Sequence, residues 1–440
     1  MFPDSPASPP DTFDAARSLL QGWRLTDFER GYRNLCGLRE HAGARRVAEL
    51  LPALSRLLPR TADPDMALNN LERLFARPGV AEQVPAFLEH RARGLETLLH
   101  LLGTSQFFAD TLVTNPDFLD ALRQPLRRTP GTQELLGQLQ GEVDAAYEDS
   151  AVLRAFRRFR QRQLLRIGAN DVIRDRPLEE ITRELSRAAD VALEVAFRTA
   201  RRGLVERFGE PHAADGRPAR CAVLAFGKLG GEELNYSSDI DLMFVYDADG
   251  STRGRRTSLG NDEFFARLVG EVVRLLSAHT DRGQAYRVDL RLRPEGQRGP
   301  LARSLPGTLA YYDHFGRTWE RQALIKLRPV AGDRALGQEL IDALEPFVYR
   351  RYLTAAEINE IKAMKRRMER KARDAGESER DVKTGRGGIR DIEFAVQFLQ
   401  LLNGGDLTAV RQRSTLAALE ALASAGCLTH QEYRTLDDSY

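Results

Sequence analysis

Three aspartates, Asp239, Asp241 and Asp289, have residue types and a spacing that could carry out chemistry. Asp239 and Asp241 lie two apart at the start of a predicted strand, so both carboxylates project from one face while Ile240 enters the core. Two carboxylates held this close repel each other, and a bound cation relieves the repulsion. Mg²⁺ takes hard oxygen ligands and keeps positions open for substrate phosphates, so the pair favours metal-assisted transfer at phosphorus. The alternatives are a solvated Asp-x-Asp at a strand end and a plain calcium site.

A glycine turn precedes the aspartate pair and could hold a phosphate group. Gly227, Lys228, Gly230 and Gly231 lie between a predicted strand and Asp239. Glycines at such a turn let backbone N–H groups approach an anion, and Lys228 adds a positive charge. We therefore predict nucleotide or phosphate binding at these four residues, with a simple turn as the alternative.

The segment around Asp289 alternates strictly between apolar and charged residues. This pattern predicts a strand with Asp289 on the same face as Arg287, Arg291 and Arg293. An aspartate among three arginines suits a third metal ligand surrounded by phosphate-binding cations. We select Arg291 and Arg293 as the phosphate-binding candidates. A cross-strand ladder of ion pairs is the alternative.

Weaker signals come from residues outside these three motifs. Ser237 and Ser238 could contact phosphate oxygens, although capping a turn is the commoner role for a serine before an aspartate. Lys326 shares a face with Arg328 on another predicted strand and is a further phosphate-binding candidate.

A second glycine loop occurs near the C-terminal end of the chain. An anion site is one interpretation of this loop; capping of the following helix by Asp391 and Glu393 is the interpretation we favour. The loop contains Lys383, Arg386, Gly387 and Gly388.

The elements that must position these residues form an α+β arrangement. Apolar residues at three- and four-residue intervals predict helices before residue 207 and after residue 351, and Pro52 is expected to start or kink one of them. A helix is predicted over 262–278 and a linker over 209–217. Strands are predicted over residues 221–226, 240–246, 285–293 and 323–330. We predict a disordered tail (1–13), a helical region (14–207), an α+β catalytic domain (208–350) and a helical region (351–440) that ends inside a helix, as in a truncated or engineered chain.

Composition excludes several classes of protein. The chain of 440 residues has a net charge of +2 and lacks an apolar run long enough for a membrane span or a signal peptide. Its 3 cysteines fit neither a zinc site nor a disulfide framework, which favours the cytoplasm. An arginine-rich helix near residues 153–166 suggests a nucleic-acid-binding polymerase-like protein, but near-neutral charge and the lack of interleaved exposed aromatic residues argue against nucleic acid.

The aspartate and glycine motifs resemble those of the DNA polymerase β-type nucleotidyltransferase superfamily. The resemblance implies a mixed sheet with helices for residues 208–350, and it departs at Lys228, where the superfamily usually has Gly or Ser. Longer strings are similar to the family of glutamine synthetase adenylyltransferase/adenylyl-removing enzymes. They are FRRFRQRQLLRIGANDV, GKLGGEELNYSSDIDLMFVYD, YRVDLRLRPEGQRGPLA, WERQALIKLRPVAGD and KTGRGGIRDIEFAVQ.

This second resemblance implies a substrate and a direction. The layout is similar to the N-terminal, adenylyl-removing half of that family, which removes AMP from a tyrosine of glutamine synthetase by phosphorolysis and yields ADP. The implied participants are Mg²⁺ on Asp239, Asp241 and Asp289, inorganic phosphate, ADP or ATP, and a PII-type signal protein, and the implied role of the reaction is to regulate nitrogen assimilation. The alternatives are adenylylation of glutamine synthetase from ATP and a non-catalytic regulatory scaffold.

Overall fold

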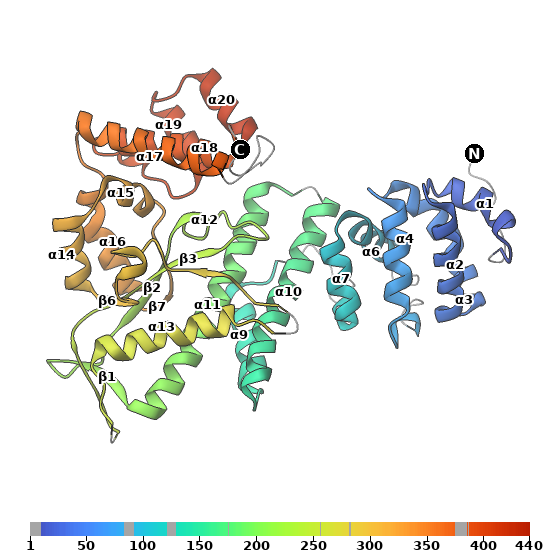
Figure 1. The fold of residues 1–440 in the computed structure, drawn as a ribbon, viewed down its shortest axis with the longest axis horizontal. Helices are drawn as coiled ribbons and strands as arrows, with labels where there is room; N and C mark the ends of the chain where they lie inside the picture. The colour runs from blue at the N-terminus through green and yellow to red at the C-terminus, as the bar shows by residue number, and fades with distance from the viewer. Residues whose placement is uncertain are drawn as a thin grey trace. The chain divides into compact units, whose positions relative to one another are not determined.

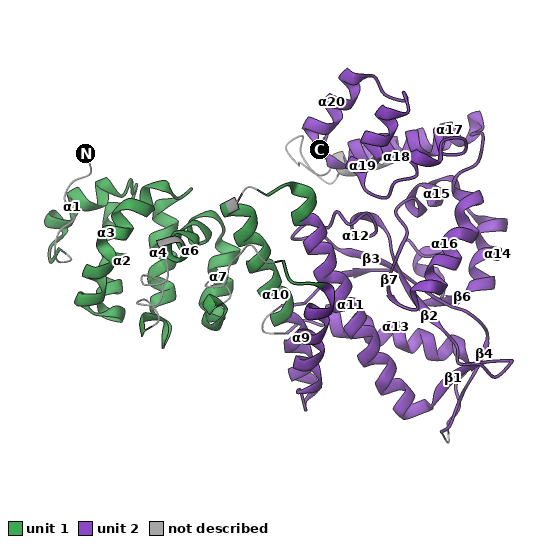
Figure 2. Ribbon diagram, turned by 180° about the vertical axis from the view of Figure 1, so that it is seen from behind, with its two compact units in different colours: residues 1–131, 158–181 green, residues 132–157, 182–440 purple. Residues whose placement is uncertain are grey.

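The computed structural model describes residues 10–82, 92–120, 129–174, 176–255, 257–280, 283–374, 385 and 387–440. The chain divides into two compact units, coloured green and purple in Figure 2. Unit 1 holds residues 1–131 and 158–181, and unit 2 holds residues 132–157 and 182–440. Most of the predicted tail, Lys383 and Arg386 lie outside the described residues.

All the described regular elements of unit 1 are helices. Asp27 and Asp63 accept hydrogen bonds from the first turns of two of its helices, which satisfies backbone donors that a helix start leaves unpaired. Pro52 lies inside a continuous helix, so that helix does not begin there. The helices are α1 (Phe13–Gly22), α2 (Phe28–Ala42), α3 (Ala44–Leu57), η1 (Leu58–Arg60), α4 (Pro64–Phe75), α6 (Ala92–Thr104), α7 (Gln106–Thr114) and η2 (Pro116–Phe118).

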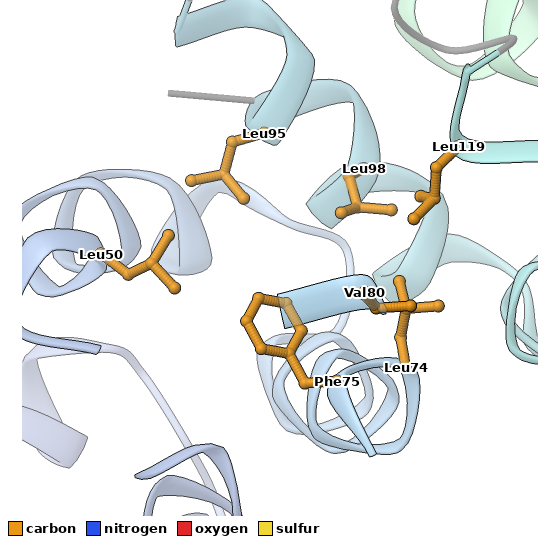
Figure 3. Close-up of a pocket in the computed structure, with 7 residues that line it drawn as sticks. All are labelled: Leu50, Leu74, Phe75, Val80, Leu95, Leu98 and Leu119. Atoms are coloured by element: carbon orange, nitrogen blue, oxygen red, sulfur yellow. The ribbon is translucent and has the colours of Figure 1, made fainter. Parts of the chain in front are cut away.

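A pocket in unit 1 is apolar throughout. Figure 3 shows its side chains, which converge from α3, α4, α6 and the segments beside them. Among the described residues that line this pocket, none has a polar side chain that could orient a charged ligand, so this lining does not suit a nucleotide. The lining residues are Leu50, Leu74, Phe75, Val80, Leu95, Leu98 and Leu119.

Unit 2 is built on a mixed sheet with the order β5-β3-β2-β7, and β6 also pairs with β3 (Figure 1). β2 is antiparallel to both β3 and β7, whereas β5 and β6 are parallel to β3. β5 pairs with the beginning of β3 and β6 with its end, so both use the same edge. The strands are β2 (Cys221–Ala225), β3 (Ile240–Tyr246), β5 (Val288–Asp289), β6 (Ala302–Ser304) and β7 (Arg328–Gly332).

Helices cover the sheet and extend beyond it. Ala222 and Leu224 of β2 and Met243 and Val245 of β3 share one core cluster with apolar residues of α16 (Arg334–Val348). Figure 1 shows the C-terminal helices gathered together in orange and red. Apart from two longer helices, the other described helices of unit 2 are α9 (Thr132–Asp144), α12 (Gly227–Gly230), α13 (Asn261–Ser277), η3 (Gly296–Arg298), α14 (Leu305–Phe315), α15 (Thr318–Leu324), α17 (Ala355–Asp374), α18 (Ile389–Asn403), η4 (Thr408–Val410), α19 (Thr415–Ser424) and α20 (His430–Ser439).

Two long helices, α10 (Asp149–Arg174) and α11 (Leu178–Phe208), each contribute to both units. The arginine-rich segment predicted as a helix lies in α10. Arg157 in this segment is buried and donates to the carbonyl oxygens of Gly283 at 2.9 Å and of Ala278 after α13. This arginine therefore satisfies a helix end and is unavailable to a nucleic acid.

The sequence predicted the α+β class and several elements correctly. The strand over 240–246 has the predicted bounds, the strand over 221–226 ends one residue earlier, and the helix over 262–278 begins and ends one residue earlier. The predicted linker over 209–217 contains a strand, β1 (Glu210–Ala213), which pairs antiparallel with β4 (Gly250–Arg253). No described helix has the length and apolar character needed to cross a membrane.

Two strand predictions were wrong in extent. The strand over 285–293 is reduced to β5, because Oδ1 of Asp289 accepts from the backbone N–H of Arg291 at 2.8 Å and turns the chain. The strand over 323–330 begins only at Arg328, because the preceding residues complete α15 and a turn. Apolar residues in short runs fit a strand and a buried helix equally well, which explains the second error.

Candidate active site

Asp241 and Asp289 lie side by side on neighbouring parallel strands. The register pairs Ile240 with Val288 and Asp241 with Asp289, and the N–H of Ile240 donates to the carbonyl oxygen of Arg287 at 2.9 Å. Ile240 is fully buried, so the carboxylates on either side of it belong to the opposite face of β3. The sequence pattern alone could not supply this register, which places the third aspartate beside the Asp-x-Asp pair.

Arginines contact the two outer carboxylates of the three, those of Asp239 and Asp289. Arg287 is paired with Asp239 and also donates to the carbonyl oxygen of Ser237 at 2.9 Å. Nε of Arg291 lies 2.8 Å from Oδ2 of Asp289. Burial would raise the pKa of Asp289, but its bonds to Arg291 outweigh burial and hold the pKa below its usual range. Asp289 is therefore a carboxylate at neutral pH.

The glycine turn lies against Asp241. Gly227 has φ of +56°, and a Cβ at this position would lie 2.9 Å from Oδ2 of Asp241. A Cβ at Gly230 would lie 2.0 Å from the carbonyl oxygen of Lys326. Both positions therefore need glycine, one for its backbone conformation and the other for the close approach of a neighbouring chain segment.

The two serines between the turn and the strand differ in their contacts. Oγ of Ser238 accepts from the N–H of Asn235 at 3.3 Å, and the N–H of Ser238 donates to the carbonyl oxygen of Asn235 at 3.2 Å, so Ser238 closes a turn with Asn235. Ser237 contributes its carbonyl oxygen to Arg287. Phosphate contact remains a prediction for both serines.

Arg293 and Lys326 are enclosed by protein groups. Arg293 donates to the carbonyl oxygens of Leu290 at 2.7 Å, Gly299 at 2.9 Å and Pro300 at 3.0 Å, so it holds the chain between β5 and β6 in place. Burial lowers the pKa of this guanidinium. These contacts favour a structural role over phosphate contact.

Lys326 is also buried, and its ammonium group contacts two carboxylates. Its Nζ lies 2.7 Å from Oε2 of Glu233 and 2.9 Å from Oε1 of Glu393. Burial alone would lower the pKa of Lys326, but the charges of Glu393 and Glu233 outweigh it and raise the pKa. Lys228, which the sequence also selected, lies 3.5 Å from the same Oε1 of Glu393. Glu393 therefore joins two of the predicted phosphate-binding lysines.

The three aspartates offer the type of oxygen donor that a hard divalent cation prefers. Asp241 and Asp289 offer carboxylate oxygens from adjacent register positions, and Asp239 lies two residues before Asp241. In the part of the chain that the structure describes, no three His, Cys, Asp or Glu side chains converge closely enough to hold a metal ion. Arg287 and Arg291 hold the two outer carboxylates, so metal binding at all three aspartates requires these arginines to share or release them.

Sequence reasoning did not select three residues of this region. Arg287 contacts Asp239, and its place in the alternating segment around Asp289 was a usable signal. Glu233 and Thr415 contact Lys326, but they lie 93 and 89 residues from it in the chain, so spacing could not reveal them.

A mixed sheet with aspartates on adjacent strands beside a glycine turn defines a nucleotidyltransferase-type catalytic unit. Residues 95–343 match the profile of a family described as glutamate-ammonia ligase adenylyltransferase. The chain belongs to this family, and the resemblance predicted from the sequence is confirmed. Residues 358–440 match a second profile, described as GlnD PII-uridylyltransferase.

Curated relatives carry both activities in their names. The chain is 39% identical over 371 residues to the bifunctional glutamine synthetase adenylyltransferase/adenylyl-removing enzyme of Thioalkalivibrio sulfidiphilus. The aligned residues make up 83% of this chain and 37% of the relative. The protein of the same name from Pseudomonas aeruginosa is 39% identical over 385 residues, or 86% of this chain and 39% of the relative. The chain thus spans less than two fifths of the length of these relatives.

Proposed function

We propose that the chain removes AMP from an adenylylated tyrosine of glutamine synthetase. In this reaction an oxygen of inorganic phosphate forms a bond to the phosphorus of the AMP group, the bond from phosphorus to the tyrosyl oxygen breaks, and ADP is the product. The observation that carries the proposal is the register pairing of Asp241 with Asp289 beside Gly227. In a chain of this family, the arrangement suits displacement at phosphorus.

Each motif has a role in this proposal. Asp239, Asp241 and Asp289 would hold Mg²⁺, which when bound stabilises negative charge on the leaving tyrosyl oxygen. Arg287 and Arg291 lie beside these carboxylates and can donate to phosphate oxygens through the N–H groups that their aspartates leave free. The amides of the 227–231 turn and Lys228 would bind the AMP phosphate from the other side.

The layout of the chain supports the direction that we propose for the reaction. One catalytic unit follows about 200 residues of helix, as in the adenylyl-removing half of the family. Adenylylation from ATP is the second candidate, because the relatives' names carry both activities. Regulation by a PII-type protein is part of the proposal and is supported by the match of residues 358–440 to a profile whose description names PII.

The test uses adenylylated glutamine synthetase, Mg²⁺ and inorganic phosphate. We expect release of ADP and, with Asp241→Asn, a loss of at least about a hundredfold in kcat, as for loss of a transition-state electrostatic contact. Asp313→Asn is the matched control, because Asp313 is exposed on α14 and makes the same change of charge away from the site. Reaction only with ATP and unmodified glutamine synthetase would reverse the assigned direction.

A further inference from the structure

The turn that carries Gly227 and Lys228 is held from two sides within unit 2. On one side, Arg328 donates to the carbonyl oxygen of Leu229 at 2.9 Å, and Oγ of Ser186 on α11 accepts from the N–H of Leu234 at 3.1 Å. These contacts fix the backbone of the turn from the sheet and from α11. On the other side the turn meets the C-terminal helices.

Lys326 is the centre of the contact with the C-terminal helices. Its ammonium group lies 2.7 Å from Glu233, which follows the turn, 2.9 Å from Glu393 on α18 and 3.0 Å from Oγ1 of Thr415 on α19. Glu233 in turn accepts from both the hydroxyl and the N–H of Thr415. A buried ammonium group with two carboxylates and a hydroxyl group is fully satisfied, so it specifies one arrangement of these elements.

The same carboxylate reaches the predicted phosphate-binding lysine. Oε1 of Glu393 lies 3.5 Å from Nζ of Lys228, whose ammonium group also lies 5.5 Å from the ring centroid of Tyr440. The side chain of Glu393 is restrained from moving with Lys228, because its shorter contact is to the buried Lys326. The lysine on the turn is therefore restrained by a carboxylate that is itself held in place.

We infer that Glu393 is a positioning residue that orders Lys228 for contact with a nucleotide phosphate, so that the C-terminal helices set the nucleotide affinity of the site. The inference rests on the proposed function only in assigning Lys228 to a phosphate of the nucleotide. A lysine side chain has many rotamers, and fixing one of them on binding costs conformational entropy. If the side chain is already ordered before the ligand binds, this entropy cost no longer weakens the affinity. Glu393 engages one N–H of the ammonium group and leaves others for the phosphate.

The test is a double-mutant cycle on ADP binding, measured by calorimetric titration with Mg²⁺ present. Glu393→Gln keeps the shape of the side chain and removes its charge, and we expect the Kd for ADP to rise about two- to tenfold. Lys228→Met should also weaken binding. Adding Glu393→Gln to Lys228→Met should cause no further loss, because the glutamate acts through the lysine. Glu420→Gln, an exposed charge removal on α19, is the matched control and should leave the Kd unchanged.

Other outcomes would overturn the inference. Tighter ADP binding by Glu393→Gln would mean that the glutamate competes with phosphate for Lys228. Additive losses in the double variant would mean that Glu393 acts only through the packing of the helices, and urea unfolding of each variant separates that effect. Absence of ADP binding by the unmodified chain would also overturn it. If the cycle behaves as expected but adenylylated glutamine synthetase yields no ADP, the proposed function fails and the positioning role stands.

Discussion

Replacement of Gly227 by alanine tests whether the glycine turn and Asp241 act together. The substitution has two effects, because an alanine at φ of +56° is strained and its Cβ would lie 2.9 Å from Oδ2 of Asp241. The strain costs about 1–2 kcal/mol of stability. An ordinary carbon contact needs roughly 3.5 Å, so the carboxylate must move by about half an ångström, which is the tolerance of a catalytic group. We expect kcat to fall roughly 10- to 100-fold.

Gly426→Ala separates the strain from the contact. Gly426 has φ of +72°, and a Cβ at this position would meet no atom of the described residues within 4 Å, so the alanine variant is strained without touching a neighbour. Urea unfolding should give similar losses of stability for both variants. ADP release from adenylylated glutamine synthetase should fall only for Gly227→Ala. Equal and near-normal kcat values in the two variants would refute the view that the turn sets the position of Asp241.

Two further predictions concern charge. Lys326→Met leaves Glu233 and Glu393 buried without their shared cation, and we expect a loss of about 3–5 kcal/mol in the free energy of unfolding; a loss below about 1 kcal/mol in urea titration would contradict the buried network. The pKa of Asp289 is lowered because its bonds to Arg291 outweigh the effect of burial. The carboxylate therefore stabilises the fold at pH values above the unfolded pKa of about 3.9. This contribution to stability is lost as the pH falls through the lower pKa of the folded state. The stability difference between the unmodified chain and Asp289→Asn should therefore be constant from about pH 5 to pH 7 and shrink below about pH 4; a difference that persists unchanged at about pH 3 would disprove this assignment.

Sequence patterns were sufficient where local chemistry determines structure. The apolar run after Asp239 predicted the bounds of β3, because a buried central strand needs apolar residues on both faces. The alternation around Asp289 was misleading, because a side-chain contact there overrides the pattern of apolar and charged residues. It fits a long strand, but the side chain of Asp289 bonds to the backbone of Arg291 and ends β5 after two residues.

The arginines and lysines show why side-chain roles are harder to predict than elements. Arg291 and Arg293 are equivalent in the sequence pattern, yet one lies on Asp289 and the other is buried against backbone carbonyls. Lys326 was expected on a strand face shared with Arg328, as a phosphate-binding residue, and instead meets carboxylates from distant parts of the chain. Local periodicity gives the face of an element, whereas these partners depend on how separate elements pack.

During translation, the glycine turn is synthesised well before the C-terminal residues that contact it. Thr415 lies 182 residues after Glu233, with which it shares a hydrogen bond of 3.1 Å. At about 5–20 residues per second, a ribosome needs roughly 10–35 s to make that stretch. The sheet and its aspartates can form during this interval, but the turn lacks its C-terminal contacts until α19 has emerged. A nascent chain can therefore form the strands that carry the aspartates before the glycine turn gains its contacts with α19.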